Sequence, residues 1–150
     1  MNHAAEMGEN LTGLEQLQAL MARDRRVPGI GQALDFYLIE VAEGRAVFEG
    51  KPGLHAYNPI GTVHGGYAAT LLDSACGCAV HSLLTADQTY TTLELKVAFH
   101  KAMTKDTGLV RAEGKVLSMG RRAAFSEAKL TDAEGRLYAS ATSTLLVMSR

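Results

Sequence analysis

The stretch Asn58–Val80, NPIGTVHGGYAATLLDSACGCAV, decides how this chain folds. It begins as a loop and leads, after His64-Gly65-Gly66, into a long apolar run without proline. Alanine, leucine and cysteine dominate this run and β-branched residues are few, so it predicts one long helix over Gly65–Leu84. The predicted helix carries one acid, Asp73. A carboxylate in an apolar helix is costly to bury unless it is paired or used, so Asp73 is the first candidate for a functional residue.

Segments with the pattern of β-strands lie on both sides of this helix. Leu34–Val41 and Arg45–Gly50 precede it and predict a hairpin. Four longer segments follow it and end at tight turns: Thr89–His100, Thr107–Leu117, Arg122–Leu130 and Leu137–Met148. Long strands joined by tight turns indicate an antiparallel sheet, and a single internal helix argues against a doubly wound parallel sheet. We therefore predict an α+β fold in which about six antiparallel strands curl around one central helix.

The N-terminal region predicts a short helix that packs on this body. Thr12 can cap it, because Glu15 follows three residues later and leucines recur at helical spacing. We expect this helix over residues 12–26, ending before Pro28. Residues 1–10 are small and polar and are expected to be flexible. The 150 residues are most simply one domain, spanning 1–150.

Charge and composition exclude several classes of partner. The net charge of −1 points to neither nucleic acid nor an anionic membrane. No apolar run reaches the ~20 residues of a membrane span, and the N-terminus lacks the pattern of a signal peptide. Cys76 and Cys78 point to different sides of the predicted helix, so they neither bridge each other nor form a zinc pair. Two buried, reduced thiols indicate a cytoplasmic protein.

The start of the predicted helix is a second candidate site. The first N–H groups of a helix have no internal partner, and Gly65 and Gly66 would let a substrate carbonyl approach them, as in an oxyanion hole. Asp73 lies about 11–12 Å further along the axis, too far to grip the same carbonyl within one chain. Small and polar residues share one helix face: Tyr67, Thr70, Ser74, Gly77 and His81. We expect this face to meet another subunit or a ligand.

These features resemble the hot-dog-fold acyl-CoA thioesterases, in particular the phenylacetic-acid-pathway (PaaI-like) group of the 4-hydroxybenzoyl-CoA thioesterase superfamily. The resemblance covers about residues 33–148 and rests on His64-Gly65-Gly66, on Leu72-Asp73 and on the order of strands around one helix. It implies that the Gly65 N–H polarises a thioester carbonyl. It also implies that Asp73 of the neighbouring subunit acts as general base or nucleophile.

The resemblance implies roles for further residues. Asn58, before the motif, would hold the reacting water or carbonyl, and a hydroxyl on the next strand, Thr91 or Thr92, would orient the water. His64, the first residue of the motif, is counted with the catalytic residues. The substrate would contact the residues around the motif and a basic turn that binds the coenzyme A phosphates: Gly66, Tyr67, Gly120, Arg121 and Arg122. No metal or cofactor is expected, since coenzyme A enters as part of the substrate. The family implies a homodimer that pairs into a dimer of dimers.

Several alternatives stay open at this point. The same fold could serve a non-catalytic acyl-CoA sensor, or a hydratase or dehydratase of enoyl thioesters in which His64 and Asp73 move protons. Aromatic and medium-chain acyl groups both fit the sequence. The dimers could pair through their helices or through their sheets, and the small polar face of the helix favours helices.

Overall fold

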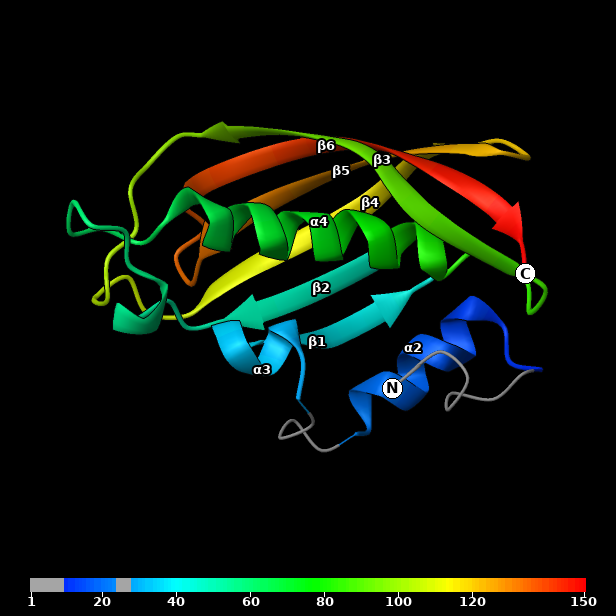
Figure 1. Ribbon diagram of the computed structural model, residues 1–150, viewed down its shortest axis with the longest axis horizontal. Coiled ribbons are helices and arrows are strands. Elements are labelled where there is room, and N and C mark those ends of the chain that lie inside the picture. The colour runs from blue at the N-terminus through cyan, green and yellow to red at the C-terminus, as the bar shows by residue number, and fades with distance from the viewer. Residues whose placement is uncertain (1–9, 24–27) are drawn as a thin grey trace.

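The computed structural model of this protein describes residues 10–23 and 28–150. Six antiparallel strands form one sheet in the order β1-β2-β4-β5-β6-β3, and the sheet curls around the long helix α4 (Figure 1). The strands and this helix are β1 (Phe36–Ala42), β2 (Arg45–Gly50), α4 (Gly65–His81), β3 (Gln88–Phe99), β4 (Val110–Met119), β5 (Ala123–Asp132) and β6 (Leu137–Ser149). The predicted α+β hot-dog architecture is therefore confirmed. The sequence predicts flexibility for residues 1–10, and residues 1–9 of that span lie outside the described residues.

Helix α4 forms the centre of the core. Leu71, Leu72, Ala75, Cys76 and Ala79 are completely buried, and the helix contacts all six strands. Full burial of each leucine stabilises the fold by roughly 1.5–3 kcal/mol. With 17 residues, α4 is the longest helix in the described part of the chain, where no helix combines the length and apolar character needed to cross a bilayer.

The sheet approaches α4 most closely at β4. Gly114 of β4 lies directly against the backbone of Ala75 and Cys76, and a Cβ at Gly114 would overlap the Ala75 carbonyl. The missing side chain lets the strand and the helix touch backbone to backbone. This contact sets the distance between the two layers at the middle of the helix.

The N-terminal helix α2 (Gly13–Met21) packs on the C-terminal end of α4. The predicted capping box is present, since the Thr12 side chain and the Glu15 carboxylate each accept from the other's backbone N–H. The Gly13 N–H donates to the Leu84 carbonyl (2.9 Å), and a Cβ at Gly13 would overlap the His81 carbonyl. The helix ends at Met21, earlier than predicted, and residues 24–27 of the expected span lie outside the described residues.

Two short helices were not predicted from the sequence. Helix α3 (Ile30–Leu34) takes Leu34 out of the expected first strand, and Asp35 ends it in a left-handed conformation (φ 54°). Aspartate tolerates this conformation better than most residues, which is why the chain can turn there into β1. The 3₁₀ helix η1 (Leu54–Ala56) lies within the loop expected over residues 51–63.

Replacing Gly114 with alanine should destabilise the protein by about 3 kcal/mol, because neither backbone at this contact can move aside. Gly29→Ala is the matched control, since a Cβ there meets no described atom within 4 Å and its φ of 166° is extended. Urea unfolding followed by circular dichroism measures both variants. Equal unfolding midpoints for Gly114→Ala and Gly29→Ala would contradict the close approach of β4 to α4.

Candidate active site

The edge strand β3 crosses the side of α4 that the other strands leave open. It meets the helix at three places: Tyr90 at Gly77, Thr92 at Asp73 and Phe99 at Gly65. A Cβ at Gly77 would lie 2.9 Å from the Tyr90 hydroxyl oxygen, so glycine is needed there for the ring to pack. The sequence led us to expect that the small polar face of α4 meets another subunit or a ligand. Part of this face is instead covered by β3 of the same chain.

Asp73 is held in place by a threonine of β3. The Thr92 hydroxyl donates to Asp73 Oδ1 (3.0 Å), and the aspartate is partly buried. The adjacent Thr91 is exposed and pairs with Leu146 on the other face of the sheet. Of the two threonines that the sequence left open, Thr92 is the one that contacts the carboxylate.

The N-terminus of α4 presents a free backbone donor. His64 caps the helix, and its Nδ1 accepts from the Gly66 N–H (2.8 Å). The Gly65 N–H has no acceptor among the residues the structure describes. Because this donor sits at the positive end of the helix dipole, it can stabilise negative charge that develops on a ligand oxygen.

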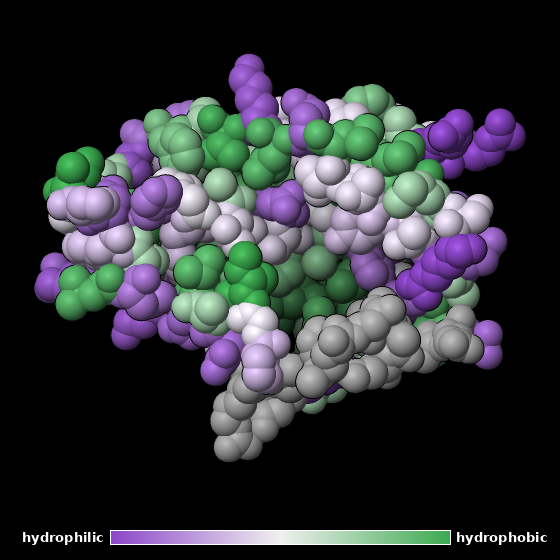
Figure 2. Space-filling model, in the orientation of Figure 1, coloured by the Kyte–Doolittle hydropathy of each residue, from purple (hydrophilic) through white to green (hydrophobic). Residues whose placement is uncertain are grey.

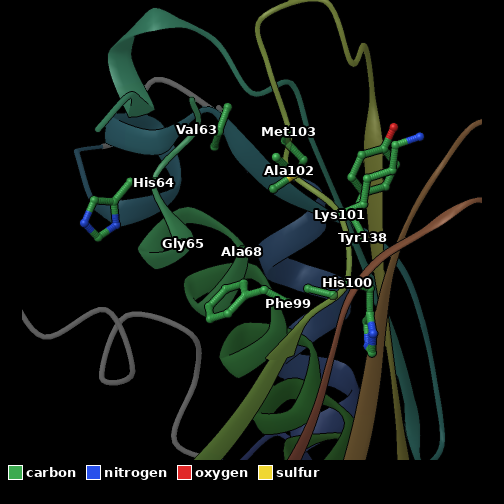
Figure 3. A pocket seen from close by; sticks show the side chains of 11 residues that line it. Val63, His64, Gly65, Ala68, Phe99, His100, Lys101, Ala102, Met103 and Tyr138 are labelled. Atoms are coloured by element: carbon green, nitrogen blue, oxygen red, sulfur yellow. The ribbon is translucent and has the colours of Figure 1, made fainter. Parts of the chain in front are cut away.

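Gly65 lines a cavity of about 310 Å³ (Figure 3). The cavity is bordered by the start of α4, the end of β3, the loop residues 100–103 and the start of β6. Polar side chains from His64, His100 and Lys101 line part of it, and the remaining lining side chains are Val63, Ala68, Phe99, Ala102, Met103, Tyr138 and Ala139. A volume of this size is at the lower end for small-molecule sites and suits a compact apolar group rather than a whole cofactor.

Asn58 holds the loop that leads to the motif. Its side-chain amide donates to Thr62 Oγ1 (3.0 Å), and its Oδ1 accepts from the backbone N–H groups of Ile60 (3.1 Å) and Thr62 (3.2 Å). These contacts close the turn that contains Gly61, where φ is +90°. The polar atoms of Asn58 are thus engaged within residues 58–62 and shape the approach to the helix.

Tyr67 points into the core rather than into this cavity. It is 2% exposed, and its ring lies edge-on to that of His55 (6.4 Å between centroids). Burial, and secondarily the charge of Asp35, raises the pKa of its hydroxyl. The oxygen lies against Gly50, where a Cβ would overlap it. The structure therefore places Tyr67 apart from the residues that surround the Gly65 N–H.

The basic turn Gly120–Arg122 lies at the opposite end of α4 from Gly65. The Val147 N–H donates to the Arg122 carbonyl (2.8 Å), and Val147 pairs with Tyr90, which packs on the last turns of the helix. Both arginine side chains are exposed, and neither forms an ion pair with a described residue. Since the helix of 17 residues is about 24 Å long, this turn cannot serve a ligand at Gly65 of the same chain without spanning that length.

One chain thus brings together two partial sites. The first contains His64, Gly65, Gly66 and the cavity, and the second contains Asp73 with Thr92. Within 10–23 and 28–150, no three His, Cys, Asp or Glu side chains gather as metal ligands would.

Sequence reasoning missed Phe99, which borders the first site. A β-bulge between Thr92 and Glu94 brings Phe99 to the helix side of the sheet, and simple alternation along the strand would have placed it on the other face.

Comparison with known proteins identifies the family of this chain. Residues 60–139, more than half of the chain, match the family model of the thioesterase superfamily. A 1,4-dihydroxy-2-naphthoyl-CoA hydrolase of Listeria monocytogenes is 25% identical over 122 residues, which cover 81% of this chain and 98% of the relative.

Solved structures of similar proteins share the fold. A hypothetical thioesterase of Streptococcus pneumoniae, solved with coenzyme A, is 28% identical with a TM-score of 0.70, covering 77% of this chain and 90% of its own. It has also been solved with alanine in place of one aspartate and, separately, of one threonine. A variant of the phenylacetic acid degradation protein PaaI from Thermus thermophilus is 26% identical with a TM-score of 0.70, covering 77% and 96% of the two chains.

The fold and the family match define a hot-dog thioesterase. The chain belongs to the thioesterase superfamily.

The two cysteines of α4 should be unreactive in the folded protein. Burial raises the pKa of the Cys76 thiol to about 11 and that of Cys78 to about 12, so both are protonated at neutral pH. At about pH 8 their reaction with a chromogenic disulfide should be roughly a hundredfold slower than in concentrated guanidinium chloride. Rapid modification of both native thiols would show that α4 is less well covered than described.

Proposed function

We propose that this protein hydrolyses an acyl-CoA thioester to a free acid and coenzyme A. The observation that carries the proposal is the Gly65 N–H, which has no acceptor among the described residues and belongs to a residue lining a cavity at the start of the helix that also holds Asp73. The Listeria relative acts on a CoA thioester and the pneumococcal relative binds coenzyme A, which supports this substrate class.

The chemistry follows from the two partial sites. Gly65 N–H would stabilise the negative charge that develops on the thioester oxygen during attack; one such donor is typically worth about 2.7–4 kcal/mol to a transition state. Asp73 would take a proton from the attacking water or attack the carbonyl itself. The C–S bond then breaks, the sulfur of coenzyme A takes up the proton, and the oxygen of water remains in the acid.

We infer that one active site combines two subunits. Eight residues of helix separate Gly65 from Asp73, a rise of about 12 Å that no side-chain motion can remove. Strand β3 is an edge of the sheet and exposes Leu93 and Phe99, and apolar side chains gather along that margin (Figure 2). Pairing of two β3 edges would cover these residues and bring Asp73 of one chain towards Gly65 of the other.

The same arrangement would give the basic turn a function. In the proposed symmetric dimer, the turn Gly120–Arg122 of one chain would lie near the start of α4 of the other, where its exposed arginines could bind the coenzyme A phosphates. We propose that such dimers pair again into a dimer of dimers. The role of Asn58 would then be to hold the loop through which the substrate reaches Gly65.

Asp73→Asn should lower kcat for acyl-CoA hydrolysis about a thousandfold with little change in stability, because the amide cannot act as a base or nucleophile. Thr92→Val, which removes the hydrogen bond to Asp73, should lower kcat about tenfold. The control is Asp106→Asn, an exposed carboxylate that pairs with Lys105 and should leave kcat unchanged. Release of free thiol from a panel of acyl-CoAs measures all three.

A folded Asp73→Asn variant with wild-type turnover would refute the mechanism, and tight binding without turnover by the wild type would instead indicate an acyl-CoA sensor.

Two inactive variants should restore activity when they form a mixed dimer. Gly65→Pro removes the N–H at a helix position that proline tolerates, and Gly65→Ala, which retains the N–H, controls for the added Cβ. A mixture of Gly65→Pro and Asp73→Asn, co-refolded, should recover about a quarter of wild-type activity, because half of the dimers are mixed and each has one intact site. No recovery in a mixture shown by light scattering to contain mixed dimers would place both residues in one chain's site.

A further inference from the structure

Tyr90 of β3 places a hydroxyl group on the same face of α4 as Asp73. Its strand partner on β6 is Val147, which is buried in the core, so the Tyr90 side chain points towards the helix. Its hydroxyl oxygen lies 2.9 Å from the position that a Cβ on Gly77 would occupy. Since residue 77 follows residue 73 by one helical turn, the hydroxyl reaches α4 directly beyond the aspartate. Pairing of two β3 edges would use the backbone of the strand and leave this inward face unchanged.

Contacts on both sides fix the ring of Tyr90. It meets the His81 ring edge-on, with 5.6 Å between the centroids and 77° between the ring planes. His81 is itself held, because its Nε2 lies 2.9 Å from Oε1 of the buried Gln16. The missing side chain of Gly77 provides the space for the end of the ring. The hydroxyl therefore has a defined position, which a group that orients a reactant requires.

The Tyr90 hydroxyl is available for a hydrogen bond. It has no partner among the residues that the structure describes, and it is not one of the fully buried oxygens that lack a partner there, which belong to Tyr67 and Ser126. The oxygen therefore borders space that a small molecule can enter. Burial raises the pKa of this hydroxyl, and Cys78 and the charge of Asp73 raise it further. The group is thus protonated at neutral pH and can orient a reactant but cannot act as a base.

One oxygen of Asp73 remains for a proton from water. Thr92 donates to Oδ1 (3.0 Å), and no residue in the described part of the chain donates to Oδ2. Side chains at 73 and 77 are neighbours on one helix face, with Cβ atoms about 5–6 Å apart. A water molecule hydrogen-bonded to two oxygens spans about 5.5 Å between them. The carboxylate and the Tyr90 hydroxyl are thus arranged so that one water can contact both.

We propose that Tyr90 holds the attacking water against Asp73, which acts as a general base. The proposal rests on the proposed thioesterase function. The Tyr90 oxygen accepts a hydrogen bond from one hydrogen of the water, and Asp73 takes the other hydrogen as a proton while the water oxygen bonds to the thioester carbon. The C–S bond breaks, and the proton passes from Asp73 to the sulfur of coenzyme A. Tyr90 gains and loses no proton, and it contributes by aiming a lone pair of the water at the carbonyl carbon.

Tyr90→Phe tests the hydroxyl alone, because phenylalanine keeps the ring that packs on His81 and Gly77. On phenylacetyl-CoA and octanoyl-CoA, kcat should fall about tenfold, the loss of one hydrogen bond to the reacting water. Affinity should stay unchanged, since calorimetry with thioether analogues, which have a methylene between sulfur and carbonyl, measures binding without attack by water. Tyr37→Phe is the matched control, because it removes a hydroxyl from β1 at the opposite edge of the sheet, and its kcat should equal that of the wild type.

A second pair of variants moves the hydroxyl from the strand to the helix. Tyr90→Val removes the ring, and a side chain at position 77 then has room, with its Cβ close to the place that the tyrosine oxygen has left. The double variant Gly77→Ser with Tyr90→Val restores a hydroxyl there, whereas Gly77→Ala with Tyr90→Val differs from it by one oxygen atom. The serine variant should exceed the alanine variant in kcat about fivefold at equal affinity for the analogues. A residue that only packs would give both double variants the same kcat.

The outcomes separate this proposal from the thioesterase function. Wild-type kcat for a Tyr90→Phe protein with a wild-type unfolding midpoint would make Tyr90 a packing residue and leave the thioesterase function intact. A single turnover in isotope-labelled water that yields an unlabelled acid would show that Asp73 attacks the carbonyl itself, and would overturn the step assigned to Tyr90. A wild type that binds the analogues and releases no thiol from any acyl-CoA would overturn both proposals.

Discussion

The backbone contact between the central helix and the sheet is the constraint on which the rest of this structure depends. Gly114 of β4 touches the backbone of Ala75, so the sheet lies as close to α4 as two backbones allow. At this distance the curled sheet can reach around the helix, and its edge strand β3 passes over the remaining side. Glycine recurs where β3 packs its aromatic rings, with Tyr90 at Gly77 and Phe99 at Gly65. Close packing of this kind fixes the position of every group on α4 relative to β3.

A rigid helix also explains why Gly65 and Asp73 of a single chain would form separate halves of the proposed site. The hydrogen-bonded rise of α4 holds Gly65 and Asp73 about 12 Å apart, and a buried helix cannot bend to shorten that distance. Thr92 further ties Asp73 to the edge strand. Catalysis would therefore depend on pairing of edges, so that assembly and activity are linked by geometry. The basic turn 120–122 lies at the far end of the same helix, so it too would need a second chain to act together with Gly65.

The local features were the easiest to predict because they depend on neighbours in sequence. The capping box at Thr12, the start of α4 at Gly65 and all six strands follow from propensity, turns and spacing. Contacts between distant segments were harder. The choice between Thr91 and Thr92 depends on which face of β3 meets the helix, and the presence of Phe99 at Gly65 depends on a β-bulge after Thr92 that shifts which of the later residues face it. No pattern in the strand itself reveals a bulge of this kind.

The sequence by itself determined the fold class and the chemical groups: one acid in an apolar helix, two glycines at its start and a basic turn. These are properties of composition and short-range spacing, which the chain carries whatever its surroundings. Only the tertiary structure decided which of these groups meet. It engaged the amide of Asn58 within its own loop, turned Tyr67 into the core and placed the Phe99 ring beside Gly65. The reason is physical: such contacts depend on strand register and on the curl of the sheet, which arise from long-range packing.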